Sequence, residues 1–135
     1  MMNCELCRAD GETILFHDEK LRVILVDEPG YPGFCRVIWH AHVKEMTDLP
    51  AADRQHLFDW VLRTEQALRT VLQPDKINLA TLGNMVPHLH WHVIPRFTDD
   101  PHFPAPIWAA PQRESQREAP ARLAERLRHV LQTFG

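Results

Sequence analysis

Residues 87–95 read PHLHWHVIP, with a histidine at every second position. Side chains alternate between the two faces of a β-strand, so His88, His90 and His92 are expected on one face and the apolar residues between them on the other. Same-face neighbours are about 6.6–6.8 Å apart along a strand, and three imidazole rings at this spacing can surround a phosphate group or a metal ion. The stretch therefore predicts a strand that packs through its apolar face and carries a reactive site on the other.

Four other segments have the composition of β-strands, at 13–16, 21–26, 34–39 and 76–82. Apolar residues recur at helical spacing over 50–72, and a second amphipathic pattern covers 120–134. Prolines near the start of 101–119 exclude regular structure, so an extended loop is expected there. These patterns predict an α+β fold in a single domain, 1–135, with an antiparallel five-stranded sheet, one long helix and a C-terminal helix.

The overall charge argues against some classes of partner. Fifteen Lys and Arg residues against eighteen Asp and Glu residues give a net charge of −3, which does not favour the basic surface that long nucleic acids require. The longest aliphatic run, 23–26, is far shorter than the roughly 20 residues of a membrane-spanning helix, and the N-terminal residues lack the layout of a signal peptide. We therefore expect a cytoplasmic protein with no nucleic-acid partner and no membrane partner.

The segment 78–96, NLATLGNMVPHLHWHVIPR, resembles the histidine triad (HIT) family, whose motif is His-φ-His-φ-His-φ-φ with φ an apolar residue. Residues 88–94 match this motif at every position. The likeness extends to an N-terminal Cys-x-x-Cys, a hairpin, a glycine-rich turn, a His-Val pair and the long helix. The lead-in at 83–87 and the pattern Pro104-x-Pro106-x-Trp108 are similar to a bacterial branch described as diadenosine tetraphosphate hydrolase-like.

The resemblance implies hydrolysis or transfer at the α-phosphate of a nucleotide derivative, such as a dinucleoside polyphosphate or a nucleoside phosphoramidate. In the family the middle histidine, here His90, forms a covalent nucleotidyl-histidine, and its other ring nitrogen donates to a backbone carbonyl. A neutral imidazole is nucleophilic near pH 7, which suits this role. The resemblance assigns to His92 a hydrogen bond to a phosphoryl oxygen. It leaves two roles open for His88, assistance to the leaving group or a zinc ligand.

The cysteines bear on this choice. In a reducing compartment they favour metal or free-thiol roles over disulfides, and the two-residue gap between Cys4 and Cys7 lets both thiolates bind one ion. By resemblance to zinc-bearing members, His42 and His88 complete a Cys2His2 set, so a structural zinc is expected, with no metal required for the chemistry. His40 is an alternative third ligand. Without zinc, both cysteines would be spectators near the chain terminus.

Other residues are candidates for contacts with the nucleotide. An apolar slot near the first strands is expected to take the base, although each of its residues could instead be plain core. The polar candidates comprise two amides and an arginine, which could neutralise phosphate or lie solvated at a strand end. The apolar candidates are Phe16, Leu25 and Ile38, and the polar candidates are Asn78, Asn84 and Arg96. Met85 replaces a hydroxyl residue common in the phosphoramidase branch, which argues against that substrate class.

Functions of two other classes remain open. A nucleotide-binding protein with only incidental turnover would use the same histidines to hold its ligand. A metal hydrolase would use all three histidines as ligands, although no carboxylate ligand lies near them in the sequence. Homodimerisation is common in the family and is expected here, through the long helix and an edge strand.

Overall fold

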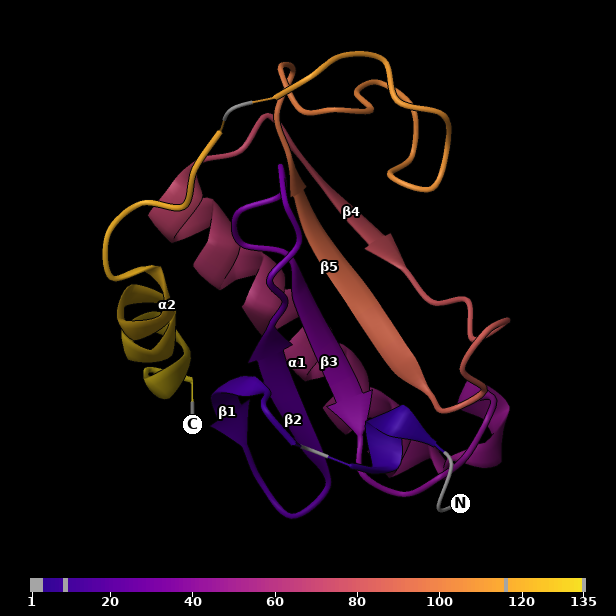
Figure 1. The fold of residues 1–135 in the computed structure, drawn as a ribbon. Helices are drawn as coiled ribbons and strands as arrows, with labels where there is room; N and C mark the ends of the chain where they lie inside the picture. The colour runs from indigo at the N-terminus through magenta and orange to yellow at the C-terminus, as the bar shows by residue number, and fades with distance from the viewer. Residues whose placement is uncertain (1–3, 9, 116, 135) are drawn as a thin grey trace.

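A single antiparallel sheet, with the strand order β1-β2-β3-β5-β4, forms the centre of the computed structural model (Figure 1). The strands are β1 (Thr13–His17), β2 (Leu21–Leu25), β3 (Cys35–Trp39), β4 (Lys76–Ala80) and β5 (His90–Arg96). The helices are α1 (Ala51–Leu72), α2 (Leu123–Gln132) and the short 3-10 helices η1 (Glu5–Cys7) and η2 (Met46–Asp48). The structure describes residues 4–8, 10–115 and 117–134, so 1–3, 9, 116 and 135 of the predicted domain lie outside the described residues. The predicted α+β fold with a five-stranded antiparallel sheet is confirmed.

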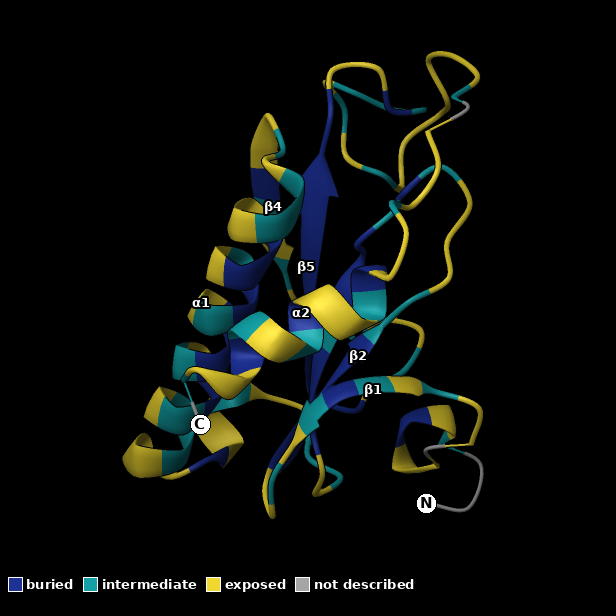
Figure 2. Ribbon diagram, turned by 90° about the vertical axis from the view of Figure 1, so that its left-hand side faces the viewer, coloured by how far each residue is buried: buried dark blue, intermediate teal, exposed yellow. Residues whose placement is uncertain are grey.

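Helix α1 packs across one face of the sheet (Figure 2). Its buried side chains recur every three or four residues and so lie along one side of the helix. They are Leu57, Trp60, Val61, Thr64, Ala67 and Leu68. Leu89 and Val93, from the apolar positions between and after the histidines, belong to the same core, and α2 completes it against α1 and β1. This packing sets the position of β5 and hence of the histidines on its opposite face.

The opposite face of the sheet is covered by η1 and by the loop that follows β5 (Figure 2). Leu6 of η1 packs on Ile38 of β3. Ile107 of the loop packs on Ile94 of β5. At the start of β5, the side chains on this face of the sheet are histidines. They lie between η1 and the loop that follows β5.

The histidine strand has different boundaries from those predicted. β5 begins at His90 rather than His88, because the His88 N–H donates to the Val86 carbonyl (2.8 Å) instead of to a neighbouring strand. β5 continues to Arg96, which pairs with Lys76 of β4. His88 is therefore a residue of the connection that precedes the strand, and its side chain need not follow the alternation of β5.

The C-terminal helix is also shorter than predicted. It begins at Leu123 rather than at 120, because Arg122 has a left-handed backbone conformation (φ 60°) that cannot continue a right-handed helix. The described part of the segment 101–119 contains no helix or strand, as its prolines predicted.

Arg96 anchors the loop that follows β5. Its guanidinium, 2% exposed, forms a two-pronged ion pair with Asp100, with Nε–Oδ2 and Nη2–Oδ1 distances of 2.8 and 3.0 Å. It also donates to the Asn78 side chain and to the Ala105 carbonyl, each at 2.7 Å. The predicted phosphate contact of Arg96 is therefore wrong, because its hydrogen bonds hold the loop against β4 and β5.

The Asp100 carboxylate is buried with its partner and needs several donors. Burial acts to raise its pKa, but hydrogen bonds from Arg96 and from three backbone N–H groups outweigh this effect and hold the pKa at about 2. The backbone donors belong to Phe97, His102 and Phe103. Ion pairing at Asp100 therefore stabilises the folded loop only while the carboxyl is ionised.

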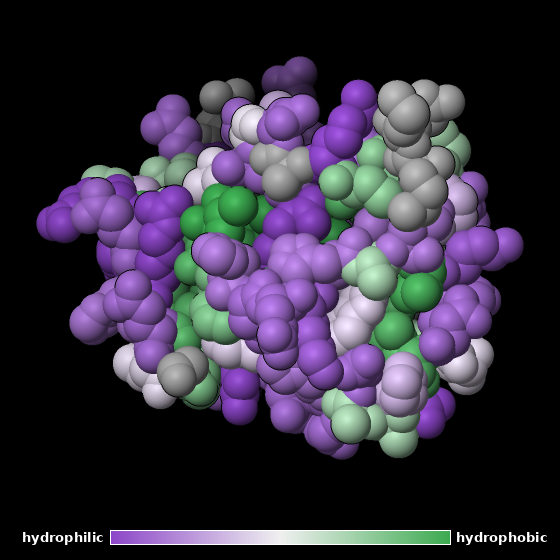
Figure 3. All heavy atoms as spheres, turned by 90° about the horizontal axis from the view of Figure 1, so that it is seen from below, coloured by the Kyte–Doolittle hydropathy of each residue, from purple (hydrophilic) through white to green (hydrophobic). Residues whose placement is uncertain are grey.

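The surface carries large exposed apolar side chains on two parts of the molecule. Hydrophilic residues cover most of the end seen in Figure 3, where hydrophobic residues appear only in separate areas. One exposed apolar group lies on α1 and β4, and the other lies near the histidines. The first group consists of Phe58, Leu62 and Leu79, and the second consists of Leu82, Met85 and Trp108. Among the described residues, no helix combines the length and hydrophobicity needed to cross a bilayer.

Replacing Asp100 tests the anchor. Asp100→Asn should lower the free energy of unfolding by about 3–5 kcal/mol, because it leaves the Arg96 charge buried without its partner. The ion pair in the native protein should stabilise fully above about pH 4 and progressively less as the pH falls toward 2, since the folded pKa lies below the unfolded one. Urea unfolding at several pH values measures both effects.

Asp99→Asn is the matched control, because the neighbouring carboxylate pairs with Arg117 (2.9 Å) on the surface and is 62% exposed. Its loss should change stability by less than about 1 kcal/mol. Equal effects of the two substitutions would contradict the anchoring role of Asp100.

Candidate active site

His90 lies at the start of β5 and is 7% exposed. Its Nδ1 donates a hydrogen bond to the backbone carbonyl of His88 (2.6 Å), the contact expected from the resemblance. When one nitrogen of a neutral imidazole donates, the other carries the lone pair. The lone pair of His90 therefore lies on Nε2, which is the atom able to act as a nucleophile. The Thr81 hydroxyl donates to the His90 carbonyl (2.6 Å) and holds the start of the strand in place.

His92 lies in the same pocket and is enclosed by other rings. It makes edge contacts with His90, Trp108 and Phe34, with centroid separations of 4.9, 5.2 and 5.7 Å. Its buried Nδ1 has no hydrogen-bond partner among the described residues. These contacts hold the His92 ring beside His90, while its polar groups are left for a ligand to satisfy.

Burial is the main cause of the low pKa values of both rings. At His90 the hydrogen bond to His88 opposes this effect and the charge of Arg36 adds to it, with a net lowering of the pKa. At His92, burial followed by the neighbouring His90 and Arg36 lowers the pKa to about 4. Both imidazoles are therefore neutral near pH 7, the form in which a ring nitrogen can attack phosphorus.

Both histidines line a cavity of about 430 Å³ on this face of the sheet. Its wall combines apolar residues from η1, the 82–86 segment and the loop after β5 with a small number of polar groups. The lining residues are Glu5, Leu6, Arg36, Leu82, Gly83, Asn84, Met85, Val86, His90, His92 and Trp108. Apolar walls with a few polar groups are typical of sites for small organic ligands.

A second hollow, of about 380 Å³, also reaches His90. It shares Leu82 and Gly83 with the first cavity and extends to Lys44 and Thr47. His90 therefore lies between two hollows, an arrangement that can accommodate a substrate with groups on both sides of the reacting atom.

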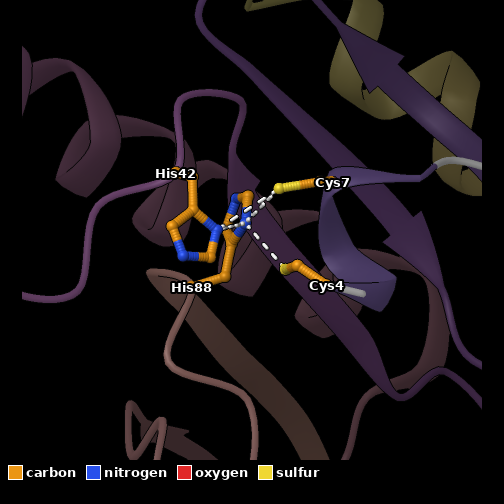
Figure 4. Close-up of side chains that lie close together, drawn as sticks. All are labelled: Cys4, Cys7, His42 and His88. Carbon is orange, nitrogen blue, oxygen red and sulfur yellow. Dashed lines mark hydrogen bonds between the residues drawn. The ribbon is translucent and has the colours of Figure 1, made fainter. Parts of the chain in front are cut away.

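The third histidine of the motif belongs to a different group of side chains (Figure 4). The Nδ1 atom of His88 lies 3.3 and 3.4 Å from the Sγ atoms of Cys4 and Cys7, and 3.2 Å from Nδ1 of His42. One potential ligand atom from each of the four residues lies within 4.8 Å of the others. The N-terminal Cys-x-x-Cys, the segment after β3 and the segment before β5 thus meet at one point.

These four residues fit a structural zinc ion. Tetrahedral Zn–S and Zn–N bonds imply ligand atoms roughly 3.3–3.8 Å apart, close to the separations at His88. The Nε2 atom of His88 donates to the Trp39 carbonyl (2.6 Å), which leaves the Nδ1 lone pair facing the cysteines, as a metal-binding histidine requires. His40 does not compete, because its Nε2 contacts the Asp18 carbonyl (3.0 Å) and it is absent from the cluster.

The HIT domain family model matches residues 9–99, which include the sheet and the motif. The chain belongs to the HIT family. A curated relative, bis(5'-nucleosyl)-tetraphosphatase (asymmetrical) from Schizosaccharomyces pombe, is 31% identical over 88 residues that cover 61% of this chain and 48% of the relative. The chain thus spans about half the length of the curated relative it matches.

Solved structures of HIT proteins have the same fold. A histidine triad protein from Marinobacter aquaeolei is 27% identical with a TM-score of 0.77, covering 94% of this chain and 93% of the other. One from Bradyrhizobium japonicum is 26% identical with a TM-score of 0.72, covering 90% and 89%. A zinc-bound HIT family protein from Mycobacterium smegmatis is 25% identical with a TM-score of 0.71, covering 98% and 96%.

The three motif histidines of this HIT domain do not all line the first cavity, which corrects the expectation that their three rings surround one group and favours the metal-binding role left open for His88. His90 and His92 line the cavity, whereas the His88 ring lies among Cys4, Cys7 and His42. The expectation failed because His88 precedes β5 and its ring is held by the Trp39 carbonyl. Among the described residues, His90 and His92 also belong to no metal-binding cluster, which removes the geometric basis for a metal hydrolase that uses the whole triad.

The predicted polar contacts separate into two cases. Asn84 lines the cavity, as a nucleotide contact would require. Asn78 does not, because its Oδ1 accepts a hydrogen bond from Arg96 and helps to anchor the loop. One of the two predicted amides is therefore placed at the HIT site and the other is part of the fold.

The predicted base slot is not formed by Phe16, Leu25 and Ile38. Phe16 stacks on Trp60 of α1 (3.7 Å between centroids), because an irregularity in β1 between positions 14 and 16 directs it to the helix side. Leu25 also packs on that side. Ile38 shares the face of His90 but is fully buried beneath Leu6. This corrects the prediction, which lacked the strand register and the cover supplied by η1.

Residues that the sequence analysis did not single out form much of the HIT cavity. Leu6 and Val86 provide apolar walls, and Glu5 and Arg36 provide charge. Arg36 had a local signal, since it is the charged residue within an otherwise apolar strand. Glu5 and Leu6 had none beyond their place in the Cys-x-x-Cys segment, because only the tertiary structure brings η1 over the sheet.

Proposed function

We propose that this HIT protein hydrolyses dinucleoside polyphosphates, such as diadenosine tetraphosphate, at the α-phosphate through a covalent nucleotidyl-His90 intermediate. The observation that carries the proposal is the hydrogen bond from Nδ1 of His90 to the His88 carbonyl, which leaves Nε2 as a neutral nucleophile on a ring that lines the cavity. A positioned nucleophile of this kind splits one difficult displacement into two easier steps.

In the first step, the Nε2 lone pair of His90 forms a bond to the α-phosphorus while the bond from phosphorus to the leaving-group oxygen breaks. The leaving nucleoside polyphosphate takes that electron pair as a stable anion. In the second step, a water oxygen attacks phosphorus, the P–N bond returns its pair to Nε2, and the water releases a proton to solvent. The products are a nucleoside monophosphate and the shortened nucleoside polyphosphate.

His92 stabilises charge on the phosphoryl oxygens in both steps. The centroid of its ring lies 4.9 Å from that of His90, and its Nδ1 atom has no hydrogen-bond partner in the described part of the chain. Donors positioned before the reaction stabilise developing charge without reorganisation. Asn84, on the wall of the same cavity, is suited to a further hydrogen bond with the phosphate.

The substrate class rests on the shape of the site and on the relative from S. pombe, whose name describes a tetraphosphatase. Two hollows meeting at His90 suit a substrate with a nucleoside on one side and a long leaving group on the other. Met85 is 93% exposed and supplies no hydroxyl for a phosphoramidate leaving group, which supports the polyphosphate over that alternative.

We further propose that Cys4, Cys7, His42 and His88 bind a structural zinc ion that takes no part in the chemistry. The donor set, the spacing and the His88 tautomer support this, together with the zinc-bound relative from M. smegmatis. The four residues would tie the N-terminus to the segment whose backbone positions His90. The exposed apolar residues Phe58, Leu62 and Leu79 support homodimerisation through α1 and β4.

Removal of the nucleophile tests the function. His90→Ala should lower kcat on dinucleoside polyphosphates by at least about 10³-fold, as expected for loss of a covalent catalyst. It should also abolish the acid-labile nucleotide adduct that we expect mass spectrometry to detect on the wild-type protein. His129→Ala, at an exposed position on α2, is the control and should retain full activity.

Retention of turnover in a folded His90→Ala protein would refute the mechanism. A wild-type protein that binds nucleotides but releases no nucleoside monophosphate from polyphosphates or phosphoramidates would instead be a nucleotide-binding protein.

Loss of a ligand tests the zinc site. His42→Ala should reduce bound zinc, measured by elemental analysis, from about one ion per chain to a small fraction of that, and should lower Tm because bound metal stabilises the folded state. His40→Ala, two residues away, should keep its zinc. Zinc-free wild-type protein with an unchanged Tm on metal addition would show that the cluster is not a zinc site.

A further inference from the structure

Arg36 lies at the centre of the histidine-bearing face of the sheet. It is in β3, paired with His92 of β5 on one side and with Ile24 of β2 on the other. Cross-strand partners project from the same face, so Arg36 and His92 are direct neighbours. Arg36 lines the same cavity as His90 and His92, and it is the only Lys or Arg among the described residues that do so.

Arg36 lacks the partners that other arginines on this face possess. Arg22 pairs with Glu12 at 2.6 Å and donates to the Leu6 carbonyl, and Arg96 pairs with Asp100. Among the described residues, the buried Nε atom of Arg36 has no hydrogen-bond partner and its guanidinium makes no ion pair.

The Arg36 guanidinium contacts an aromatic ring rather than an anion. The Arg36 guanidinium lies 5.6 Å from the centroid of Phe34, a cation–π contact that supplies no acceptor for the buried N–H at Nε. Glu5 lines the cavity too, but it is exposed and forms no ion pair with Arg36. A buried guanidinium N–H such as that at Nε of the half-buried Arg36 is unfavourable without an acceptor, which a ligand could supply.

The missing partner must be an anion that can enter the cavity beside the reactive histidines. Guanidinium groups recognise phosphate through paired hydrogen bonds, and the neighbouring His92 leaves a polar atom unsatisfied in the same place. The positive charge of Arg36 also reaches both rings, since it contributes to the low pKa values of His90 and His92.

We propose that Arg36 binds a phosphoryl oxygen of the substrate's phosphate chain and so makes the cavity select phosphorylated nucleosides. This inference rests on the proposed nucleotide substrate and adds a binding residue to that site. Arg36 takes the role that the sequence analysis gave to Arg96. The competing arrangement is a guanidinium stacked on the base, which would favour nucleosides with and without phosphate alike.

Binding of three non-reacting probes distinguishes these arrangements. Dissociation constants for adenosine, AMP and α,β-methylene-ADP are measured by calorimetry on wild-type, Arg36→Gln and Arg36→Lys proteins. The series is repeated with the corresponding guanine nucleoside and nucleotides. Arg36→Gln should weaken binding of the phosphorylated probes by about 10- to 100-fold, the loss expected for a charged hydrogen bond, and leave the nucleoside unchanged. Arg36→Lys should recover part of the loss, because it restores the charge but not the paired donors.

Arg69→Gln is the charge-matched control, because Arg69 is exposed near the end of α1 and away from the cavity. It should bind all probes as the wild type does. Thermal unfolding checks that Arg36→Gln folds, and its Tm should not fall, since the substitution removes a half-buried charge whose buried Nε has no acceptor.

An equal loss of nucleoside and nucleotide binding in Arg36→Gln, or no loss for any probe, would overturn the assignment of Arg36. Failure of wild-type protein to bind any of the probes would overturn the nucleotide substrate and this inference together. If binding follows the expected pattern while His90→Ala retains turnover, the covalent mechanism fails and the role of Arg36 stands.

Discussion

The hydrogen bond from Nδ1 of His90 to the backbone carbonyl of His88 is the constraint on which the site depends. It selects the tautomer that leaves Nε2 with a lone pair, and burial keeps the ring neutral near pH 7. The carbonyl is itself held in place, because the His88 ring donates to Trp39 and faces Cys4 and Cys7. The N-terminal segment therefore helps to hold the carbonyl that orients the His90 ring.

The motif histidines divide into a pair and a single residue. His90 and His92 share the cavity, and their neutral rings can attack and stabilise a phosphoryl group. His88 contributes its backbone to that site and its side chain to the Cys/His cluster. The position of the His88 ring among Cys4, Cys7 and His42, outside the cavity that His90 and His92 share, favours a metal-binding role over a leaving-group role.

Arginines on the histidine-bearing face illustrate how similar residues take different roles. Arg96 and Arg22 each have a carboxylate partner, and they fasten the loop after β5 and the N-terminal region to the sheet. Arg36 has none and lies beside His92. A buried, fully paired arginine stabilises a fold, whereas a partly buried and unpaired one in a cavity is available to a ligand.

The sequence by itself determined the fold class, the spacing of the histidines, the boundaries of α1 to within a residue and the Cys4/Cys7 pair, because periodicity and motif spacing are local properties. The resemblance to the HIT family added His42 and His88 to the candidate metal ligands. Only the tertiary structure decided which side chains meet. An irregularity in β1 turned Phe16 away from the site, the Asp100 carboxylate drew Arg96 into the fold, and η1 covered Ile38 with Leu6. Each of these outcomes depends on strand register or on contacts between distant segments, which a pattern along one chain does not contain.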